Sequence, residues 1–580
     1  MKKSILSLSA AVALGGLGYV GAASAAVVLQ VPGITTPTAV NVFSNPGGVG
    51  HALITPYYTA QGVMSTAFNI ANTDLKNGKA VKVRFRGASN SDDVMDFTVF
   101  LSPGDVWTAA VSRDVATGLA QISTEDKSCT YPTQTSGLWP ADFNTDRLSI
   151  QLSDAQRAAL TREGYVEVLN MADIPPTIAG TKDGYGNPLV NPLFAATKHV
   201  AGVAPCTAGP IGALMNSSLV TTPDGALAYG LDSPTGGLMG SWGVFNTEQL
   251  AVYGGAQSAL LATAEPTLGN NGTASTAPAL INFAPQTNVP VDGLFPGGMG
   301  QVADYTSDVI LLAGSVGFPP LINPGNLGPR PVLMDFPDLS TPMVTGDDPF
   351  DQASRIGIAF EKERLLNDYV AAAADASTVS WMTDWVVTQP VRRYHAAVAY
   401  DVINPGLNIL NLLVDGAFLI NADEFTGGVN GVKGDPFKPY TQQLRLQHTA
   451  YGPMACMDAA LSTLDREERT RNNQEFSPGT IRQYCGESFT LQFGNSSVLQ
   501  AGITAHSVAD LVAGPAGWAQ LVLGTPNPNA GQPGRFPTAI PAIGFAATSI
   551  KAGNGNYGLT LPHRWTGPAR FYAMPAAQPL

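Results

Sequence analysis

The chain has 580 residues and a formal net charge of -13, and it combines 62 glycines and 44 prolines with only 13% charged residues. A hydrophobic content of 44% excludes a disordered chain, and the acidic balance disfavours nucleic-acid binding, which needs a concentrated basic surface. Few charges and many turn-forming residues predict a mainly β protein with long ordered loops and a few short helices.

The N-terminus has the pattern of a secretory signal peptide. Lys2 and Lys3 precede an apolar run over residues 5–20, and residues 23–25 (Ala-Ser-Ala) are the small residues after which signal peptidase cleaves. We therefore expect residues 1–25 to be removed and the mature protein to be exported, to the outer cell surface, the extracellular space or the periplasm. No later apolar run reaches the roughly 20 residues of a membrane helix, so no transmembrane segment is predicted.

Residues 26–175 are predicted to form an N-terminal β-sandwich domain. It begins with an extended arm over residues 27–50, which either pairs within its own domain or is donated to a neighbouring molecule. Residues 51–59 and 63–71 are interpreted as the first paired strands. Asn77-Gly78 is a strong hairpin signal and predicts a tight turn into the next strand.

The clearest period lies between residues 79 and 111, which we interpret as a three-stranded β-meander. Its first strand alternates three apolar with three basic residues: Val81, Val83 and Phe85 with Lys82, Arg84 and Arg86. This two-residue period indicates one dry and one wet face, so the basic side chains are predicted on a solvent-exposed outer face. An acidic partner, such as lipopolysaccharide or another subunit, is the alternative for this basic stripe.

The remaining elements are shorter. Ser153 is a candidate N-cap for a helix over residues 154–162, and residues 165–171 form a strand that closes the first domain. A loop-rich β region follows over residues 176–345. The C-terminal domain, residues 346–580, is predicted to be β-rich with one longer helix over residues 352–374. The expected architecture is a set of antiparallel, immunoglobulin-like β-sandwich modules.

The four cysteines would enter an oxidising compartment, which favours disulfides. Three pairings are possible in principle, and we favour Cys129 with Cys206 and Cys456 with Cys485, because each pair closes a loop within one half of the chain. A metal site is the weaker interpretation, since no Cys-x-x-Cys spacing or adjacent histidine is present.

Several segments together resemble a known family. They are KAVKVRFRGASNSDDVMDFTVFLSPGDVWTA, TREGYVEVLNMAD, PTGGLMGSWGVFN, TDWVVTQPVRRYH and LDREERTRNN followed by FSP. They resemble a family of uncharacterised secreted proteobacterial proteins, known at most as cell-surface proteins, and the matching blocks cover most of the mature chain. The resemblance implies an exported surface protein and carries over no catalytic or binding residues.

Motifs for chemistry are weak. The segment around Ser315 lacks the first glycine of a nucleophile elbow, and the six histidines are scattered, which leaves open a site assembled from distant positions. Asp347, Asp348 and Asp351 are weak candidate calcium ligands, and acids that face the dipole of a helix N-terminus are the favoured explanation for them. The turn over residues 90–93 is a second acidic cluster and is expected to be exposed. No cofactor other than calcium is predicted.

These observations predict a structural protein of the cell surface that self-assembles into a layer, sheath or filament, with copies of itself as the partner. The alternatives are an adhesin or carbohydrate-binding surface protein that recognises a cell-surface glycan, and a secreted hydrolase. The 7 Trp and 17 Tyr residues could supply aromatic platforms for a sugar, although most should be in the core. An enzymatic role is disfavoured, because no catalytic motif is complete.

Overall fold

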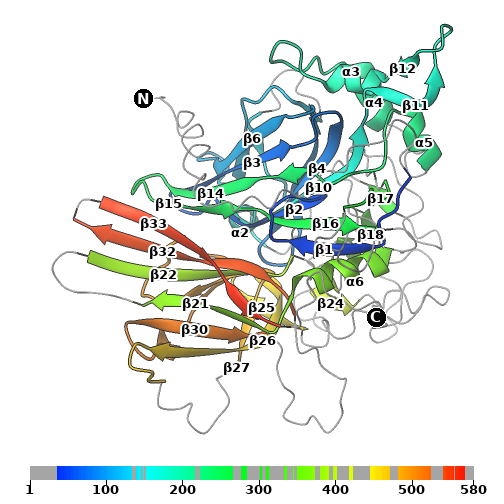
Figure 1. Cartoon of the computed structure of the whole chain (residues 1–580). Coiled ribbons are helices and arrows are strands. Elements are labelled where there is room, and N and C mark those ends of the chain that lie inside the picture. The colour runs from blue at the N-terminus through cyan, green and yellow to red at the C-terminus, as the bar shows by residue number, and fades with distance from the viewer. Residues whose placement is uncertain are drawn as a thin grey trace, which may run out of the picture.

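β-strands dominate the structure, as the many short alternating apolar segments predict. The computed structural model describes the following residues: 36–132, 139–145, 148, 152–215, 223–264, 276–281, 283, 301–303, 309–312, 332–335, 344, 349–371, 379–390, 396–401, 417–421, 444–470, 481–523, 540–553 and 555–567. Most of them belong to two β-sandwiches that lie against each other (Figure 1).

The N-terminal sandwich consists of two seven-stranded sheets. Its strands are β1 (Asn41–Asn45), β2 (Ala52–Thr59), β3 (Met64–Asn72), β4 (Gly78–Gly87), β5 (Asp93–Leu101), β6 (Val106–Arg113), β7 (Ala120–Ser123), β8 (Cys129–Tyr131), β9 (Ala141–Asp142), β10 (Glu163–Ile174), β13 (Leu238–Met239), β14 (Ser241–Asn246), β15 (Val252–Ala256) and β16 (Ser258–Thr263). The first sheet has the order β1-β16-β2-β10-β4-β5-β8, and the second has the order β15-β14-β3-β6-β7-β9, with β13 paired to β3. These sheets therefore take in strands as far as Thr263, beyond the expected boundary at residue 175.

The C-terminal sandwich is built in the same way. Its strands are β21 (Arg364–Val370), β22 (Val379–Thr388), β25 (Leu444–Thr449), β26 (Gly452–Asp465), β27 (Ile481–Cys485), β28 (Ser488–Gln492), β29 (Ala505–Ser507), β30 (Ala516–Val522), β32 (Ile543–Ala552), β33 (Gly555–Pro562) and β34 (Arg564–Thr566). One sheet has the order β25-β26-β30-β21-β34, with β27 paired to β26, and the other has the order β29-β28-β22-β32-β33. Among the described strands all pairings are antiparallel except that of β28 with β29.

Smaller elements complete the described chain. They are the hairpin β11 (Thr177–Lys182) and β12 (Pro188–Val190), the pair β20 (Glu361–Lys362) and β31 (Ile540–Pro541), the sheet β17 (Gln301–Ala303), β18 (Val309–Leu312), β19 (Val332–Asp335), β23 (Ala396–Asp401) and β24 (Ala417–Asn421), and the helices α2 (Asp154–Leu160), α3 (Pro192–Thr197), α4 (Ala208–Met215), α5 (Pro223–Ala228), α6 (Pro349–Phe360) and η6 (Ala509–Leu511). The protein is mainly β with short helices, which confirms the predicted class. Ser153 caps α2 through a capping box with Gln156, as its position predicts.

Alternating apolar residues fill the core of the N-terminal sandwich. Val81, Val83 and Phe85 on β4 are fully buried, and the Phe85 ring lies 5.6 Å from the ring of Phe68 on the opposing sheet. The Phe68 ring is in turn 5.7 Å from that of Trp107. The apolar half of the predicted alternation on β4 is therefore confirmed.

The two sandwiches share a continuous apolar interface. The ring of Trp242 on β14 lies 4.6 Å from the ring of Phe545 on β32. At the same junction the backbone N–H of Gly254 on β15 donates to Oγ1 of Thr560 on β33, over 3.0 Å. Because Phe545 belongs to the same buried cluster as the core of the N-terminal sandwich, the interface continues that core.

The predicted strand pairings of the first domain are partly wrong. β4 and β5 pair as expected, but β6 pairs with β3 in the other sheet, so the segment over residues 79–111 is not a meander. β2 and β3 also lie in different sheets, and the Asn77-Gly78 turn leads from one sheet to the other. The alternation of a strand predicts which residues face the core, but it does not specify the neighbouring strand.

The long helix predicted over residues 352–374 is too long. α6 ends at Phe360, and the chain continues as β20 and β21. In β21 the side chains of Leu365, Asn367 and Tyr369 are buried while Arg364 and Asp368 are exposed. This alternation has the two-residue period of a strand. Pairing with β30 and β34 stabilises the strand over a continuation of the helix.

Both favoured disulfides are present. Cys129 on β8 joins Cys206, with 5.3 Å between the Cα atoms, and Cys456 on β26 joins Cys485 directly opposite on β27. Each bond closes a loop within one sandwich or its neighbouring loops, as predicted from the separation of the cysteines. Within the described chain, no helix is long and apolar enough to cross a membrane.

Candidate functional site

The structure describes little of the calcium candidates. Asp347 and Asp348 lie outside the described residues, as does Ser315, and of Asp351 the structure describes only its place in α6. Among the residues that are described, no group of three or more His, Cys, Asp or Glu side chains is arranged to hold a metal ion.

The second acidic cluster, the turn over residues 90–93, is buried and not exposed as expected. Asn90 Oδ1 accepts a hydrogen bond of 2.9 Å from the backbone N–H of Ala455 on β26. The Ser91 hydroxyl contacts the Tyr165 hydroxyl at 2.7 Å and the carboxylate of Glu487. The β4–β5 turn is therefore inserted against the C-terminal sandwich, and its polar groups serve that contact.

The basic stripe of β4 is also buried, which contradicts its predicted exposure. Lys82 Nζ lies 3.3 Å from Asp96 on β5, and Arg84 Nη1 lies 3.6 Å from Glu167 on β10. Arg86 Nε approaches the same Glu167 carboxylate at 3.4 Å. Arg84 stands opposite an acid in both neighbouring strands, Asp96 on β5 and Glu167 on β10. Because neighbouring strands supply the opposite charges, this face can be covered by protein.

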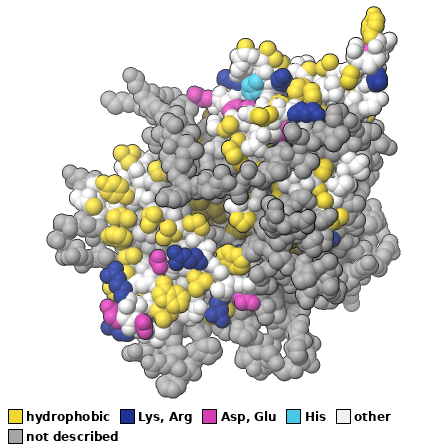
Figure 2. All heavy atoms as spheres, viewed as in Figure 1, with side chains coloured by type: hydrophobic (Ala, Val, Ile, Leu, Met, Phe, Trp, Pro, Cys, Tyr) yellow, Lys and Arg dark blue, Asp and Glu magenta, His cyan; other side chains and the backbone are white. Residues whose placement is uncertain are grey.

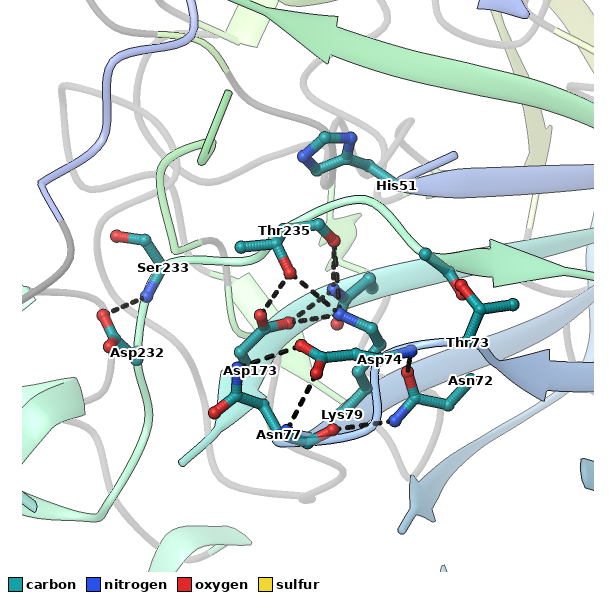
Figure 3. A network of polar contacts seen from close by, with 12 residues as sticks. His51, Asn72, Thr73, Asp74, Asn77, Lys79, Asp173, Asp232, Ser233 and Thr235 are labelled. Carbon is teal, nitrogen blue, oxygen red and sulfur yellow. Dashed lines mark hydrogen bonds and ion pairs between the residues drawn. The ribbon is translucent and has the colours of Figure 1, made fainter. Parts of the chain in front are cut away.

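A further buried ion pair lies at the other end of β4 (Figure 3). Lys79 Nζ is 2.7 Å from Asp173 Oδ1, and both side chains have no exposed area. Thr235 donates from Oγ1 to Asp173 Oδ2 over 2.5 Å, while its own backbone oxygen accepts from Lys79 over 3.4 Å. Asn170 donates from Nδ2 to Asp173 Oδ1 over 2.9 Å and to the Thr235 backbone oxygen over 3.0 Å. We call Lys79, Asn170, Asp173 and Thr235 the Lys79 cluster.

A β-bulge in β10 assembles this cluster. Val81 stands opposite Asn170, and Ala80 stands opposite Ala172, so Met171 is the extra residue. In a regular strand, positions 170 and 173 would point to opposite faces, because successive side chains alternate. The bulge changes the phase, and both side chains reach Lys79.

His51 lies beside the Lys79 cluster and stays neutral. Its Nδ1 accepts the backbone N–H of Ala262 over 3.2 Å, so its Nε2 carries the proton and donates to the Ala277 oxygen over 3.1 Å. Burial, followed by the charge of Lys79, lowers the pKa of His51 to about 3. His51 is therefore a structural link between strands and not a base that titrates near neutrality.

Two buried acids, Glu163 and Asp384, accept hydrogen bonds from the same loop, residues 497–503, at the junction of the sandwiches. Glu163 on β10 accepts hydrogen bonds from Tyr57, over 2.8 Å, and from the backbone of Gly502 and Ile503, over 3.1 Å each. Burial raises the pKa of Glu163, although these hydrogen bonds oppose the rise. The loop that supplies the two N–H groups belongs to the C-terminal sandwich, so Glu163 links the two sandwiches.

Asp384 on β22 is the second of these acids. Its Oδ2 accepts from the Ser497 hydroxyl over 2.6 Å and from the Leu499 N–H over 3.1 Å. Its Oδ1 has no hydrogen-bond partner in the described part of the chain. Burial first, and the charge of Glu163 to a smaller extent, raise the pKa of Asp384 to about 7.

A serine, a histidine and an aspartate meet at the β5–β6 turn, but they do not form a catalytic triad. Ser102 Oγ is 2.8 Å and Asp105 Oδ2 is 3.4 Å from the same ring nitrogen, Nδ1 of His199. A triad needs the serine and the acid on different ring nitrogens, so that the ring can relay a proton. The Ser102 hydroxyl also accepts the backbone N–H of His199 over 2.9 Å, which is a structural role.

The described polar clusters thus connect strands, turns and sandwiches. Part of this arrangement could be predicted from the sequence, because Asp96 and Glu167 occupy strand positions opposite the basic stripe. The β-bulge that brings Asn170 and Asp173 together could not be predicted from the sequence.

Comparison with protein-family models, with curated proteins and with solved structures finds no match for this chain.

Proposed function

We propose that the protein is an exported structural protein of the cell surface, built from immunoglobulin-like sandwiches, which associates with copies of itself into a layer, sheath or filament. Two features support this proposal. The described polar clusters are buried and join strands, as in a rigid building block, and the two disulfides are compatible with export into an oxidising compartment.

The observation that carries the proposal is an apolar patch on the edge of the C-terminal sandwich. Trp381 on β22 stands opposite Ile550 on β32, which stands opposite Tyr557 on β33. Tyr557 is 59% exposed, Trp381 is 41% exposed, and Leu559, two residues further along β33, is also 41% exposed. We call these four residues the β33 patch. Figure 2 shows hydrophobic side chains on the face of this sandwich that is in view.

A second copy of the chain is the occupant that this patch fits. Within the described sheet, β33 pairs only with β32, so its eight residues have one edge of backbone donors and acceptors without a strand. Gly558 and Thr560 face β15 of the N-terminal sandwich, so Tyr557 and Leu559 point the other way. An edge strand with exposed apolar side chains is a template for pairing with another chain.

Replacing Leu559 by lysine is expected to weaken self-association at least about tenfold, because the charge would be desolvated in the contact. The measurement is light scattering of the mature protein after size-exclusion chromatography over a range of concentrations. The matched control is Val115→Lys, since Val115 is 92% exposed in the turn between β6 and β7, away from the patch. Equal association of the Leu559→Lys variant and the wild type would exclude the β33 patch as the contact.

Glycan binding is the second candidate, because two exposed aromatic side chains, Trp381 and Tyr557, lie on the same patch. Aromatic rings offer apolar faces against which a sugar can pack. A glycan array with the wild type and a Trp381→Ala variant separates the two functions. Signals that depend on Trp381, from a protein that stays monomeric, would favour the glycan-binding function.

A further inference from the structure

In the Lys79 cluster, a primary amine and a side-chain amide are held side by side. Lys79 Nζ and Asn170 Nδ2 contact the same two oxygen atoms: Asp173 Oδ1, at 2.7 and 2.9 Å, and the Thr235 backbone oxygen, at 3.4 and 3.0 Å. The Lys79 amine and the Asn170 amide are therefore held against the same pair of oxygen atoms.

The reacting groups of the Lys79 cluster are fully buried. Lys79, Asn170 and Asp173 all have 0% exposed area. The amide oxygen, Oδ1 of Asn170, has no hydrogen-bond partner among the described residues. A buried polar atom without a partner destabilises the folded state, so the amide is poorly explained as a purely structural hydrogen-bonding group. The β-bulge at Met171 is needed to bring this amide and the acid to the same amine.

We propose that Lys79 and Asn170 join through an intramolecular isopeptide bond, with Asp173 as the group that transfers the protons. The product is an amide between Lys79 Nζ and Asn170 Cγ. It would connect β4 covalently to β10, the two neighbouring strands at the centre of the first sheet.

The reaction balances without any further reagent. The Lys79 ammonium gives one proton to the Asp173 carboxylate, and the neutral amine attacks Asn170 Cγ. The bond between Cγ and Nδ2 then breaks as Asp173 returns the proton to the leaving nitrogen. The amine loses two protons in total, the leaving NH₂ group gains both, and it departs as ammonium. Burial raises the pKa of Asp173, although Lys79 opposes the rise, and this favours its role as a proton carrier.

The remaining contacts place the three groups for this chemistry. Thr235 donates to Asp173 Oδ2, which leaves Oδ1 facing both nitrogens. Exclusion of water favours the condensation, because hydrolysis would need a water molecule at the same carbon. The bond would add rigidity to an exported chain, but its presence does not depend on the proposed self-association.

The test is peptide mapping of the mature, exported full-length chain after denaturation and reduction. The isopeptide bond predicts that trypsin no longer cleaves after Lys79, and that one branched peptide contains Lys79 and Asn170, with a mass lower by one ammonia. Two separate linear peptides of unchanged mass would overturn the proposal. A branched peptide lighter by one water would assign the bond to Asp173 and overturn the assignment to Asn170. This experiment uses only the wild type, so no folding defect can obscure it.

Variants then test the roles. Asn170→Ala and Lys79→Arg are expected to abolish the branched peptide, and Asp173→Ala is expected to abolish it although both reacting groups remain. The matched control is Lys82→Arg, since Lys82 is a buried, ion-paired lysine on the same strand. It should retain the branched peptide in full. A branched peptide that persists in folded Asp173→Ala protein would contradict the proton-transfer role.

Discussion

Replacing Asp384 by asparagine is expected to stabilise the protein relative to the wild type as the pH rises. Burial raises the pKa of Asp384 from the ordinary aspartate value of 3.8 to about 7. In this window the unfolded chain loses a proton that the folded chain retains, so the wild type loses stability as the pH rises through it. The shift corresponds to roughly 4 kcal/mol between about pH 4 and about pH 8.

Asparagine is neutral at every pH and retains an oxygen that can accept from Ser497 and Leu499. The difference in free energy of unfolding between the variant and the wild type, measured by urea denaturation across this range, should therefore grow with pH. Asp368→Asn is the control, because Asp368 is an exposed carboxylate on β21. A constant difference between Asp384→Asn and the wild type would show that Asp384 titrates as an ordinary carboxylate.

Replacing Glu167 by glutamine is expected to cost about 3–5 kcal/mol of stability. Glu167 is 2% exposed, and its Oε2 lies 3.6 Å from Arg84 Nη1 and 3.4 Å from Arg86 Nε. The substitution removes the charge that both buried guanidinium groups share, but it leaves the shape of the side chain almost unchanged. The loss should appear as a lower urea midpoint with an unchanged slope.

An exposed ion pair provides the comparison. Asp154 on α2 lies 2.5 Å from Arg157, and its side chain is 94% exposed. Water solvates this pair in the folded and unfolded states alike, so Asp154→Asn should leave the urea midpoint within error of the wild type. If Glu167→Gln also left the midpoint unchanged, the buried charges of β4 would not contribute to stability in the way that their contacts indicate.

The basic stripe of β4 illustrates what the sequence could predict. Its period was visible, and the burial of Val81, Val83 and Phe85 is confirmed. The exposure of the alternate residues was predicted wrongly, because a strand with charged residues on one face is usually half exposed. The strand pairing that brings Asp96 and Glu167 beside Arg84 is set by contacts between distant segments, and a single strand does not encode it.

The Lys79 cluster shows a second limit. Asn170 and Asp173 meet Lys79 only because of the bulge at Met171, and a bulge depends on the register between two strands. The cysteine pairs were easier to predict, since separation along the chain alone favoured them. The short helix α2 was predicted from a local signal, its cap at Ser153, which does not depend on distant contacts.

The buried polar groups in the described part of the chain mainly join parts of the same molecule. The turn after β4, the carboxylate of Glu163 and the Trp242 ring all contact the C-terminal sandwich. Such contacts make the two sandwiches one unit, and an array assembled from copies needs units of constant shape. We propose that the edge at β33 binds the next copy.

The central claim is that this unit associates with itself, and the most direct measurement is the mass of the native mature protein in solution as a function of concentration. Light scattering after size-exclusion chromatography should show masses that rise from one chain to ordered multimers, and negative-stain microscopy of cell-surface material should show a regular layer, sheath or filament. A mass of one chain at every concentration, with no ordered material at the cell surface, would contradict the claim.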